Sequence, residues 1–533
     1  MTFDRRTFLK GVTAFAAASQ LDIFAGAASA VGSNAPWFTT DNAALLKRYN
    51  AALHALSQNT QTLSRYSRPV LLEGSVYKGV WLECAPHEGL VYGAFRPEVA
   101  VANHDIFFAL QREDGYLPCN VKPDMMGTGQ IQMVVPIAAT ALELARQIGD
   151  SKLLETAYAA CSRWDAWLLR YRNTRNTGLC EGFCTYDTGH DNSPRWKGIP
   201  NRCPDTDARK APDVSGMPRL CPDLSATVYG GRIALAQMAR ELGRVSEAAR
   251  WEESAAAIRK LIMEHLYEAD EGAFYDLDVD NKFVRIRGDL ITRVLGEHVV
   301  DQSTFENVYA KQIHNPKAFW APYPLPSIAM DDPAFVRPIP RNSWGGATQA
   351  LTALRAPRWM EYYGKPSDLA HMMTQWVKAL VRAGDFRQQM DPVTGDFTVA
   401  DPGGYSPAAL VFVDYVWRLH GVRQNNDSLE WNCRRPEGAK HSEFAIKTPQ
   451  GTAALTHTKD ASALKIGPRT LMTVKGTARV VTDAQGNLRE IVGTSSISEQ
   501  VQLQATGAKA KTIRVAPNQH LTASELKVER RSE

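Results

Sequence analysis

Several features that would assign a function directly are missing from this sequence. It has no run of five or more basic residues, and 61 Lys and Arg against 57 Asp and Glu leave a net charge of only +4 over 533 residues. Nucleic acid and anionic membrane surfaces are therefore not expected partners. No Gly-rich phosphate loop and no Gly-x-Ser-x-Gly elbow occur, which argues against a doubly wound nucleotide-binding fold and a serine hydrolase.

The first thirty residues have the pattern of a targeting segment. Arg5-Arg6 is followed by an Ala-rich apolar stretch that ends in Ala28-Ser29-Ala30, a spacing that signal peptidase cuts after. Gln20 and Asp22 interrupt this stretch, which leaves it short of the about 18 residues that a membrane span requires. We expect residues 1–30 to be a twin-arginine signal peptide recognised by the export machinery, and the mature chain to be periplasmic or secreted with no stable membrane anchor.

Four of the eight cysteines are clustered in the sequence. No CxxC pair or zinc-type Cys/His spacing accompanies them, so no metal site is predicted. An oxidising compartment permits disulfides, and we expect either disulfides or buried free thiols. The clustered residues are Cys180, Cys184, Cys203 and Cys221.

Helical periodicity dominates residues 40 to 420. Apolar residues recur at helical spacing over Ile131–Leu142, Leu224–Leu242 and Leu369–Leu380. About ten to twelve such helices, joined by loops rich in Pro, Gly and Asp, are expected.

The pattern changes after residue 424. Asn425-Asn426-Asp427-Ser428 is typical of a linker, and Thr470–Val481 alternates between apolar and polar residues. A turn at 483–487 leads back into a strand at Leu488–Val492, which predicts a hairpin. We expect residues 424–533 to form a small C-terminal β-sandwich-like domain that supports the fold rather than binding sugar.

The segment from Tyr186 to Trp196 carries the densest set of chemically useful side chains. Its Gly, Asn, Ser and Pro residues lie too close together for a helix, so it must be a loop, and it holds two carboxylates, a His, an Arg and two aromatics. Loops of this composition often bind a ligand. A solvated turn that caps the next helix is the alternative.

This loop resembles the Glu-Ser-Gly-Trp-Asp-x-Ser-Pro-Arg loop of the glycoside hydrolases related to family 63, the trehalases and the mannosylglycerate hydrolases. Asp187 replaces their Glu and His190 replaces their Trp. Residues 111–118 and 129–132 are similar to two further segments of that group, and the likeness covers about residues 80 to 420. It implies a mainly α fold in which residues 31–423 form an (α/α)6 barrel, called six-hairpin glycosidase-like.

The resemblance also implies an activity, the hydrolysis of an O-glycosidic bond in an oligosaccharide or small glycoside, exo-acting and with inversion. It gives the role of general acid to Asp191, whose carboxyl must stay protonated near neutrality, as burial in an aromatic-lined site allows. Arg195 is expected to orient a substrate hydroxyl or to hold a carboxylate such as Asp187. The expected substrate-binding residues are Tyr186, Asp187, His190, Arg195, Trp196, Gln130, Trp344 and Gln388.

The general base is where this sequence departs from the family. Family members have a Glu three residues before the Asp of their Asp-Pro-x-Thr-Gly turn, and here that position is Gln388, which cannot take a proton from water. Three interpretations are open: another carboxylate is the base, phosphate attacks directly in a phosphorolytic relative, or the chain binds sugar without turnover. We expect a relocated base, and the candidates are Glu88, Glu98, Asp187 and Asp391.

The sequence predicts a carbohydrate substrate and no cofactor. Barrels of this kind sometimes bind calcium, but no Asp-rich calcium loop is present. A polysaccharide lyase on a similar barrel would line its cleft with basic residues, Tyr and His to neutralise a uronic acid. The expected site is instead rich in carboxylates and Trp, which disfavours a lyase.

Overall fold

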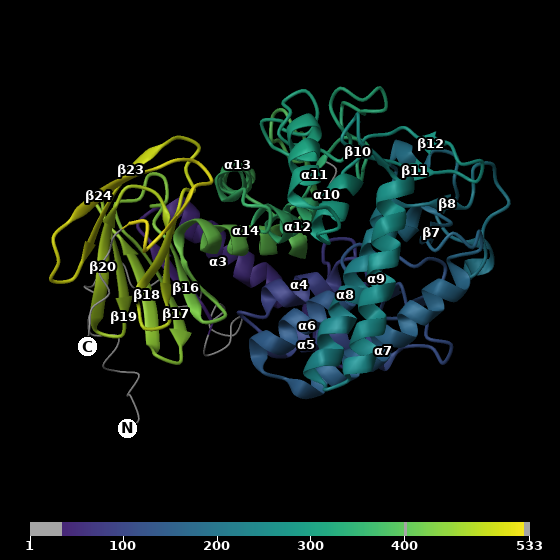
Figure 1. Cartoon of the computed structure of the whole chain (residues 1–533), viewed down its shortest axis with the longest axis horizontal. Helices are drawn as coiled ribbons and strands as arrows, with labels where there is room; N and C mark the ends of the chain where they lie inside the picture. Colours follow the sequence, from purple (N-terminus) through teal and green to yellow (C-terminus); the bar gives the residue numbers. More distant parts are fainter. Residues whose placement is uncertain (1–34, 399–401, 527–533) are drawn as a thin grey trace.

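A computed structural model describes residues 35–398 and 402–526, so the predicted signal peptide lies outside the described residues. The described residues contain twelve α-helices, α3 to α14, on one side of the molecule, and two larger antiparallel β-sheets on the other (Figure 1). No helix in this part of the chain is long and apolar enough to cross a membrane.

Alternate helices contact one another in a closed ring. Each contacts the next in the ring, and α14 contacts α4 again. We call these the inner helices. In order around the ring they are α4 (Ala85–Tyr92), α6 (Ile137–Ile148), α8 (Pro222–Glu241), α10 (Leu290–Gly296), α12 (Ala350–Met360) and α14 (Ser406–His420).

The other helices cover this ring. α3 packs on α14, α5 on α4 and α6, α7 on α6 and α8, α9 on α8, and α13 on α12 and α14. The bounds of these helices are α3 (Ala43–Gln58), α5 (Pro97–Ala109), α7 (Ser151–Tyr171), α9 (Val245–His265), α11 (Gln302–Val308) and α13 (Pro366–Ala383).

Local sequence explains how these helices begin and end. The side chains of Asn42 and Asp150 accept the backbone N–H groups that open α3 and α7. Gly149 and Gly384, with φ of +70° and +76°, end α6 and α13 in the left-handed conformation that glycine adopts at little cost. α14 is buried on almost every side, whereas α9 buries a single stripe, as expected for an inner and a covering helix.

Short strands lie in the segments that lead into the inner helices. Each group pairs segments that are distant in sequence and so brings them to one end of the ring. The groups are β4 (Val80–Trp81), β5 (Asn120–Val121) and β6 (Met126–Gly127); β7 (Glu181–Gly182), β8 (Arg219–Leu220), β11 (Asp276–Leu277) and β12 (Phe283–Val284); and β13 (Thr348–Gln349) with β14 (Gln389–Met390). Two further pairs lie elsewhere, β2 (Thr60–Leu63) with β3 (Tyr66–Leu71) and β9 (Tyr267–Glu268) with β10 (Ala273–Phe274).

The C-terminal region forms the two larger sheets. The seven-stranded sheet has the order β1 (Trp37–Thr40), β17 (Ser442–Thr448), β18 (Gly451–His457), β19 (Ser462–Ile466), β20 (Arg469–Lys475), β23 (Glu499–Ala505) and β24 (Lys511–Val515). The five-stranded sheet has the order β15 (Val422–Asn425), β16 (Ser428–Asn432), β21 (Arg479–Asp483), β22 (Leu488–Val492) and β25 (His520–Thr522). One strand of the larger sheet, β1, therefore comes from the segment that we assigned to the barrel.

The predicted hairpin is confirmed, since β21 and β22 pair as antiparallel neighbours. The predicted linker at residues 425–428 is wrong. Asn425 pairs with Ser428 in a tight turn between β15 and β16, and Asn426 has a φ of +51°. Asn tolerates this left-handed conformation, so the polar run serves as a hairpin turn.

Candidate active site

A buried ionic framework holds the loop of residues 186–196 at the end of the ring. The Arg195 guanidinium donates two hydrogen bonds to each of the carboxylates of Asp223 and Asp276, at 2.6–2.8 Å. Burial alone would raise the pKa of Asp223, but the charge of Arg195 lowers it to about 2. Arg195 therefore binds these two carboxylates rather than Asp187, and we infer that it fixes the loop in place.

His190 extends this framework toward the next inner helix. Its Nδ1 accepts a 3.0 Å hydrogen bond from Arg195, and its Nε2 lies 2.7 Å from the carboxylate of Asp289, the residue just before α10. Because arginine only donates, the ring proton lies on Nε2 and faces Asp289. Burial lowers the pKa of His190 to about 4, so the ring is neutral near pH 7. His190 thus orients the loop and packs 5.0 Å from the Trp344 ring.

Asp187 is fully buried. It is fully paired with the guanidinium of Arg172 and also accepts backbone N–H groups from Ile131, Phe183 and Cys184. Both carboxylate oxygens of Asp187 accept hydrogen bonds from within the protein. This placement does not favour Asp187 as a catalytic base or a sugar ligand.

Asp191 lies at the tip of the loop and is partly exposed. Burial raises the pKa of its carboxyl to about 6, although a hydrogen bond from Asn342 and the charge of Arg202 act in the opposite direction. The Asn342 amide donates to Asp191 Oδ2 at 2.9 Å, and Asp191 O accepts the backbone N–H of Trp344 at 3.0 Å. The carboxyl is therefore held at one oxygen, and its pKa lies in a range where it exchanges protons near neutrality.

Gln388 is joined to Asp191 through a single residue. Tyr77 donates to Gln388 Oε1 at 3.0 Å, the Gln388 amide donates to Asn342 Oδ1 at 2.8 Å, and Asn342 donates to Asp191. All three bonds run in one direction and place a donor against the carboxylate. Gln388 is thus connected to Asp191 by hydrogen bonds, and its role in substrate binding stays a prediction.

Glu83 also belongs to this site, although no sequence motif pointed to it. Its carboxylate lies against the backbone of Gly189, two residues before Asp191. Burial and the charge of Asp191 raise the pKa of Glu83 to about 7, while Arg293 and Arg355 act in the opposite direction. The residue lies two positions before α4, and the only signal available in the sequence was a Glu among apolar residues before a helix with Pro86 in its first turn.

Two further buried carboxyl groups, Glu73 and Glu88, interact electrostatically with Glu83. Burial raises the pKa of Glu88 to about 8, and burial and the charges of Glu88 and Glu83 raise the pKa of Glu73 well above its usual range. The Tyr405 hydroxyl donates to Glu73 at 2.7 Å. Glu88, one of the predicted bases, is fully buried, and its pKa is affected by the charge of Glu83.

The other predicted bases lie in different surroundings. Glu98 is an exposed residue at the start of α5 and pairs with Arg96. Asp391 pairs with Arg337 at 2.8 Å and accepts backbone N–H groups of its own turn. Neither Glu98 nor Asp391 forms one of these bonds with Asp191.

Of the predicted aromatic and amide residues, Trp196, Trp344 and Gln130 are buried, and Tyr186 is partly exposed. Trp196 is only 2% exposed and its indole donates to Thr188 at 2.9 Å, which favours a packing role. Tyr186 is partly exposed, with Arg202 over its ring, and Trp344 packs in a cluster with Trp81. Gln130 is buried and donates to Gln132 at 3.1 Å, in the segment before α6.

Within the described residues, two groups of buried side chains are of types that can bind a metal ion. The first is Cys184, Asp187 and Cys203, and the second is Cys221, Asp223 and Asp276. In each group the aspartates are already paired with a buried arginine, Arg172 in the first and Arg195 in the second. A cation would have to displace a guanidinium, so neither donor set fits a metal.

The helical ring is the fold of a class of glycoside hydrolases. The chain superposes on the GH63 mannosylglycerate hydrolase of Thermus thermophilus with a TM-score of 0.57 at 18% identity, over 68% of this chain and 99% of that one. For the neutral trehalase of Saccharomyces cerevisiae the TM-score is 0.51 at 14% identity, over 65% and 73%. The α-L-rhamnosidase of Dictyoglumus thermophilum matches 91% of this chain and 50% of its own length, with a TM-score of 0.54 at 12% identity.

Residues 77–417 match the profile of the mannosylglycerate hydrolase MGH1-like glycoside hydrolase domain. The chain therefore belongs to the MGH1-like glycoside hydrolase family and is a glycosidase. Among curated proteins, none matches the sequence significantly.

Proposed function

We propose that this chain is an exported glycoside hydrolase that cleaves an O-glycosidic bond of an oligosaccharide or small glycoside, exo-acting and with inversion. The closed ring of inner helices supports an (α/α)6 barrel as its architecture, followed by a C-terminal β domain. Residues 1–30 support export through the twin-arginine machinery into the periplasm or the medium. The substrate is a carbohydrate, and the mechanism needs no cofactor.

The main support for this proposal is the placement of Asp191. A carboxyl with a pKa of about 6 retains a proton close to neutrality and can transfer it to the leaving glycosidic oxygen. Asn342 binds Oδ2 at 2.9 Å, so Oδ1 is left to carry the proton, and the amide then stabilises the carboxylate that remains.

We propose Glu83 as the second catalytic carboxyl, in place of the missing Glu at position 388. In the reaction, water forms a bond to the anomeric carbon as the glycosidic bond breaks, Asp191 protonates the leaving oxygen, and Glu83 takes the proton of the water. Inversion requires the two carboxyls to lie roughly 6.5–9.5 Å apart to leave room for that water. The electrostatic effect of Asp191 on Glu83 supports this assignment.

A second candidate follows from Gln388, which reaches Asp191 through Asn342 alone. In this candidate, the neutral amide of Gln388 lies opposite the acid, Asp191. Phosphate or another nucleophile that needs no base then attacks the sugar. Alternatively, the site binds sugar without turnover. The two candidates differ in their dependence on phosphate and on Glu83.

The test uses the mature chain and a panel of 4-nitrophenyl glycosides and neutral disaccharides, with and without inorganic phosphate. We expect phosphate-independent hydrolysis that falls by about 10²- to 10⁴-fold in both Asp191→Asn and Glu83→Gln, with the inverted anomer as first product by NMR. Glu297→Gln is the matched control, since Glu297 is also buried with a pKa of about 7 but lies at the other end of α10.

Each alternative has its own outcome. Full activity in Asp191→Asn would overturn the assignment of the acid. Full activity in Glu83→Gln with loss in Asp191→Asn would reject Glu83 alone. Release of sugar phosphate only when phosphate is present would favour phosphorolysis, and a gain of hydrolysis in Gln388→Glu would place the base at the family position.

A further inference from the structure

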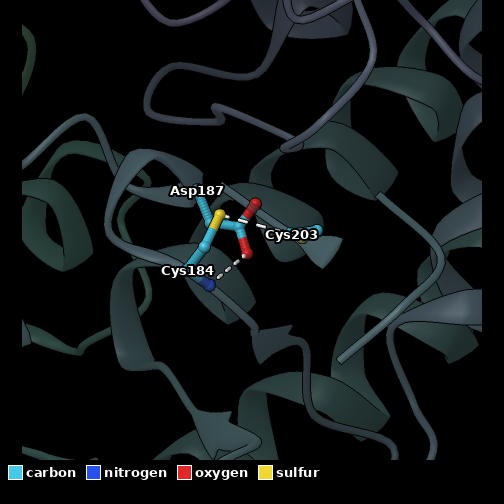
Figure 2. A group of neighbouring side chains, drawn as sticks. All are labelled: Cys184, Asp187 and Cys203. Carbon is cyan, nitrogen blue, oxygen red and sulfur yellow. Dashed lines mark hydrogen bonds between the residues drawn. The ribbon is translucent and has the colours of Figure 1, made fainter. Parts of the chain in front are cut away.

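Cys184 and Cys203 lie at the two ends of the loop that carries Asp191. Their Sγ atoms are 3.8 Å apart, and the side chains are 0% and 3% exposed. Figure 2 shows Cys184, Asp187 and Cys203 grouped together, with a dashed line between the two cysteines. Phe183 packs with the two cysteines in a small apolar cluster.

The backbone already holds these two segments side by side. Thr185 N–H donates to Pro200 O at 3.0 Å, and Tyr186 N–H donates to Asn201 O at 3.2 Å. A disulfide requires the sulfurs to approach to about 2.0 Å. Because the main chains are already adjacent, a small movement of the two side chains is enough to bring the sulfurs together.

We propose that Cys184 and Cys203 form a disulfide bond that closes the Asp191 loop in the exported protein. The oxidising compartment rests on the proposed export, whereas the reactivity of the pair rests on the geometry alone. This bond goes beyond the glycosidase activity, because it concerns the covalent state of the loop and not the reaction.

The chemistry balances with a disulfide oxidant such as glutathione disulfide. The Cys203 thiolate attacks one sulfur of the oxidant, releases one thiol and forms a mixed disulfide. Cys184 then attacks Cys203 Sγ, the second thiol leaves with the proton of Cys184, and the Sγ–Sγ bond forms.

The surroundings favour Cys203 as the first nucleophile. The guanidinium of Arg172 donates to its Sγ at 3.6 Å and places positive charge where negative charge develops. Cys203 also lies in an exposed segment, since Arg202 and Pro204 on either side are exposed. Burial raises the pKa of the Cys184 thiol, which keeps Cys184 protonated until the mixed disulfide is in place.

The experiment compares the purified mature chain after incubation with glutathione disulfide and with dithiothreitol. Thiols are alkylated under denaturing conditions and the non-reduced digest is mapped by mass spectrometry. We expect the oxidised chain to lose two thiols and to yield one linked peptide joining Cys184 to Cys203. Its melting temperature should rise by about 2 °C or more.

Cys184→Ala and Cys203→Ala should abolish both the linked peptide and the rise in melting temperature, whereas Cys161→Ala, which alters a buried thiol of α7, should keep both. Peptide mapping of the unmutated chain decides the outcome even if a variant folds poorly. Retention of all thiols, a stable glutathione adduct on Cys203, or a link between other cysteines would overturn the proposal.

Discussion

The carboxylate of Glu83 lies so close to the backbone of Gly189 that a methyl group at residue 189 would fall 1.6 Å from Glu83 Oε2. Gly189 also has a φ of +62°, a conformation that other residues adopt only with strain. The loop that presents Asp191 and the segment that presents Glu83 are therefore fitted to each other through a residue without a side chain.

Gly189→Ala is expected to lower kcat/KM by about tenfold or more, because Glu83 must move away from its position beside the loop. Gly198→Ala is the control, since Gly198 has a φ of +82° but has no neighbour within 4 Å of the added methyl group. Kinetics on the best glycoside of the panel and melting temperatures separate the two effects. An equal loss of kcat/KM in both variants would mean that backbone strain, not Glu83, is responsible.

Activity should have a narrow pH optimum. The proposed reaction needs one proton shared between Asp191 and Glu83, whose pKa values are raised to about 6 and about 7. Below about pH 6 both carboxyls gain protons and the base is lost, and above about pH 7 both lose protons and the acid is lost. A profile of kcat/KM from pH 4 to 9 should therefore be bell-shaped, and Glu83→Gln should remove one limb. A flat profile would contradict the assignment of the pair.

Arg195→Ala should destabilise the protein by about 3–5 kcal/mol, because it leaves the buried carboxylates of Asp223 and Asp276 without their counter-charge. Arg209→Ala removes an exposed pair with Asp207 and should cost no more than about 1 kcal/mol. Calorimetry of the two variants measures the difference. Similar melting temperatures would show that the framework around Arg195 is not a main support of the loop.

The ion pair between Glu361 and Arg479 joins the end of α12 to strand β21, at 2.6 Å. Although burial would raise it, the pKa of Glu361 is lowered to about 2 by Arg479. A lowered pKa stabilises the fold above the unfolded value of about 4.5 and loses this effect as the pH falls toward 2. Glu361→Gln should therefore lower the melting temperature at pH 7, and the difference from the unmutated chain should shrink below about pH 4.5. A constant difference from pH 7 to pH 3 would contradict this.

Apolar periodicity predicted some helices well and misplaced others. The pattern at Leu224–Leu242 corresponds to α8, which ends just before Gly243. The pattern at Ile131–Leu142 corresponds only in part to α6, which starts at Ile137, because Pro136 precedes the helix and Gln132 has a φ of +46°. Ile131 and Val134 are buried in a loop, and a buried loop has no periodicity of its own to set it apart.

The predicted strand at residues 470–481 is wrong, because the chain turns within this segment. We predicted alternation throughout residues 470–481, but Gly476 has a φ of +95° and the chain turns there between β20 and β21, which belong to different sheets. Position within the sheets depends on partners distant in sequence, which alternation alone does not specify.

The candidate site was predictable only where a motif marked it. The roles of Asp191 and Gln388 were predicted from the resemblance to family motifs, and both residues bind Asn342. Glu83 is more than a hundred residues from Asp191 in the sequence. Its role depends on the convergence of the segments that precede α4 and α8, and this convergence is a property of the closed ring.

Strand β1 has a consequence for the timing of assembly. Thr40 bonds to His441, 401 residues later, and the ring of Phe38 packs against Phe444 at 5.6 Å. Strand β1 therefore has no partner strand until the chain has been synthesised as far as β17. The large sheet can thus be completed only after residues in the last quarter of the chain have been made. Such an order of assembly suits a transport route that accepts a cargo only after folding.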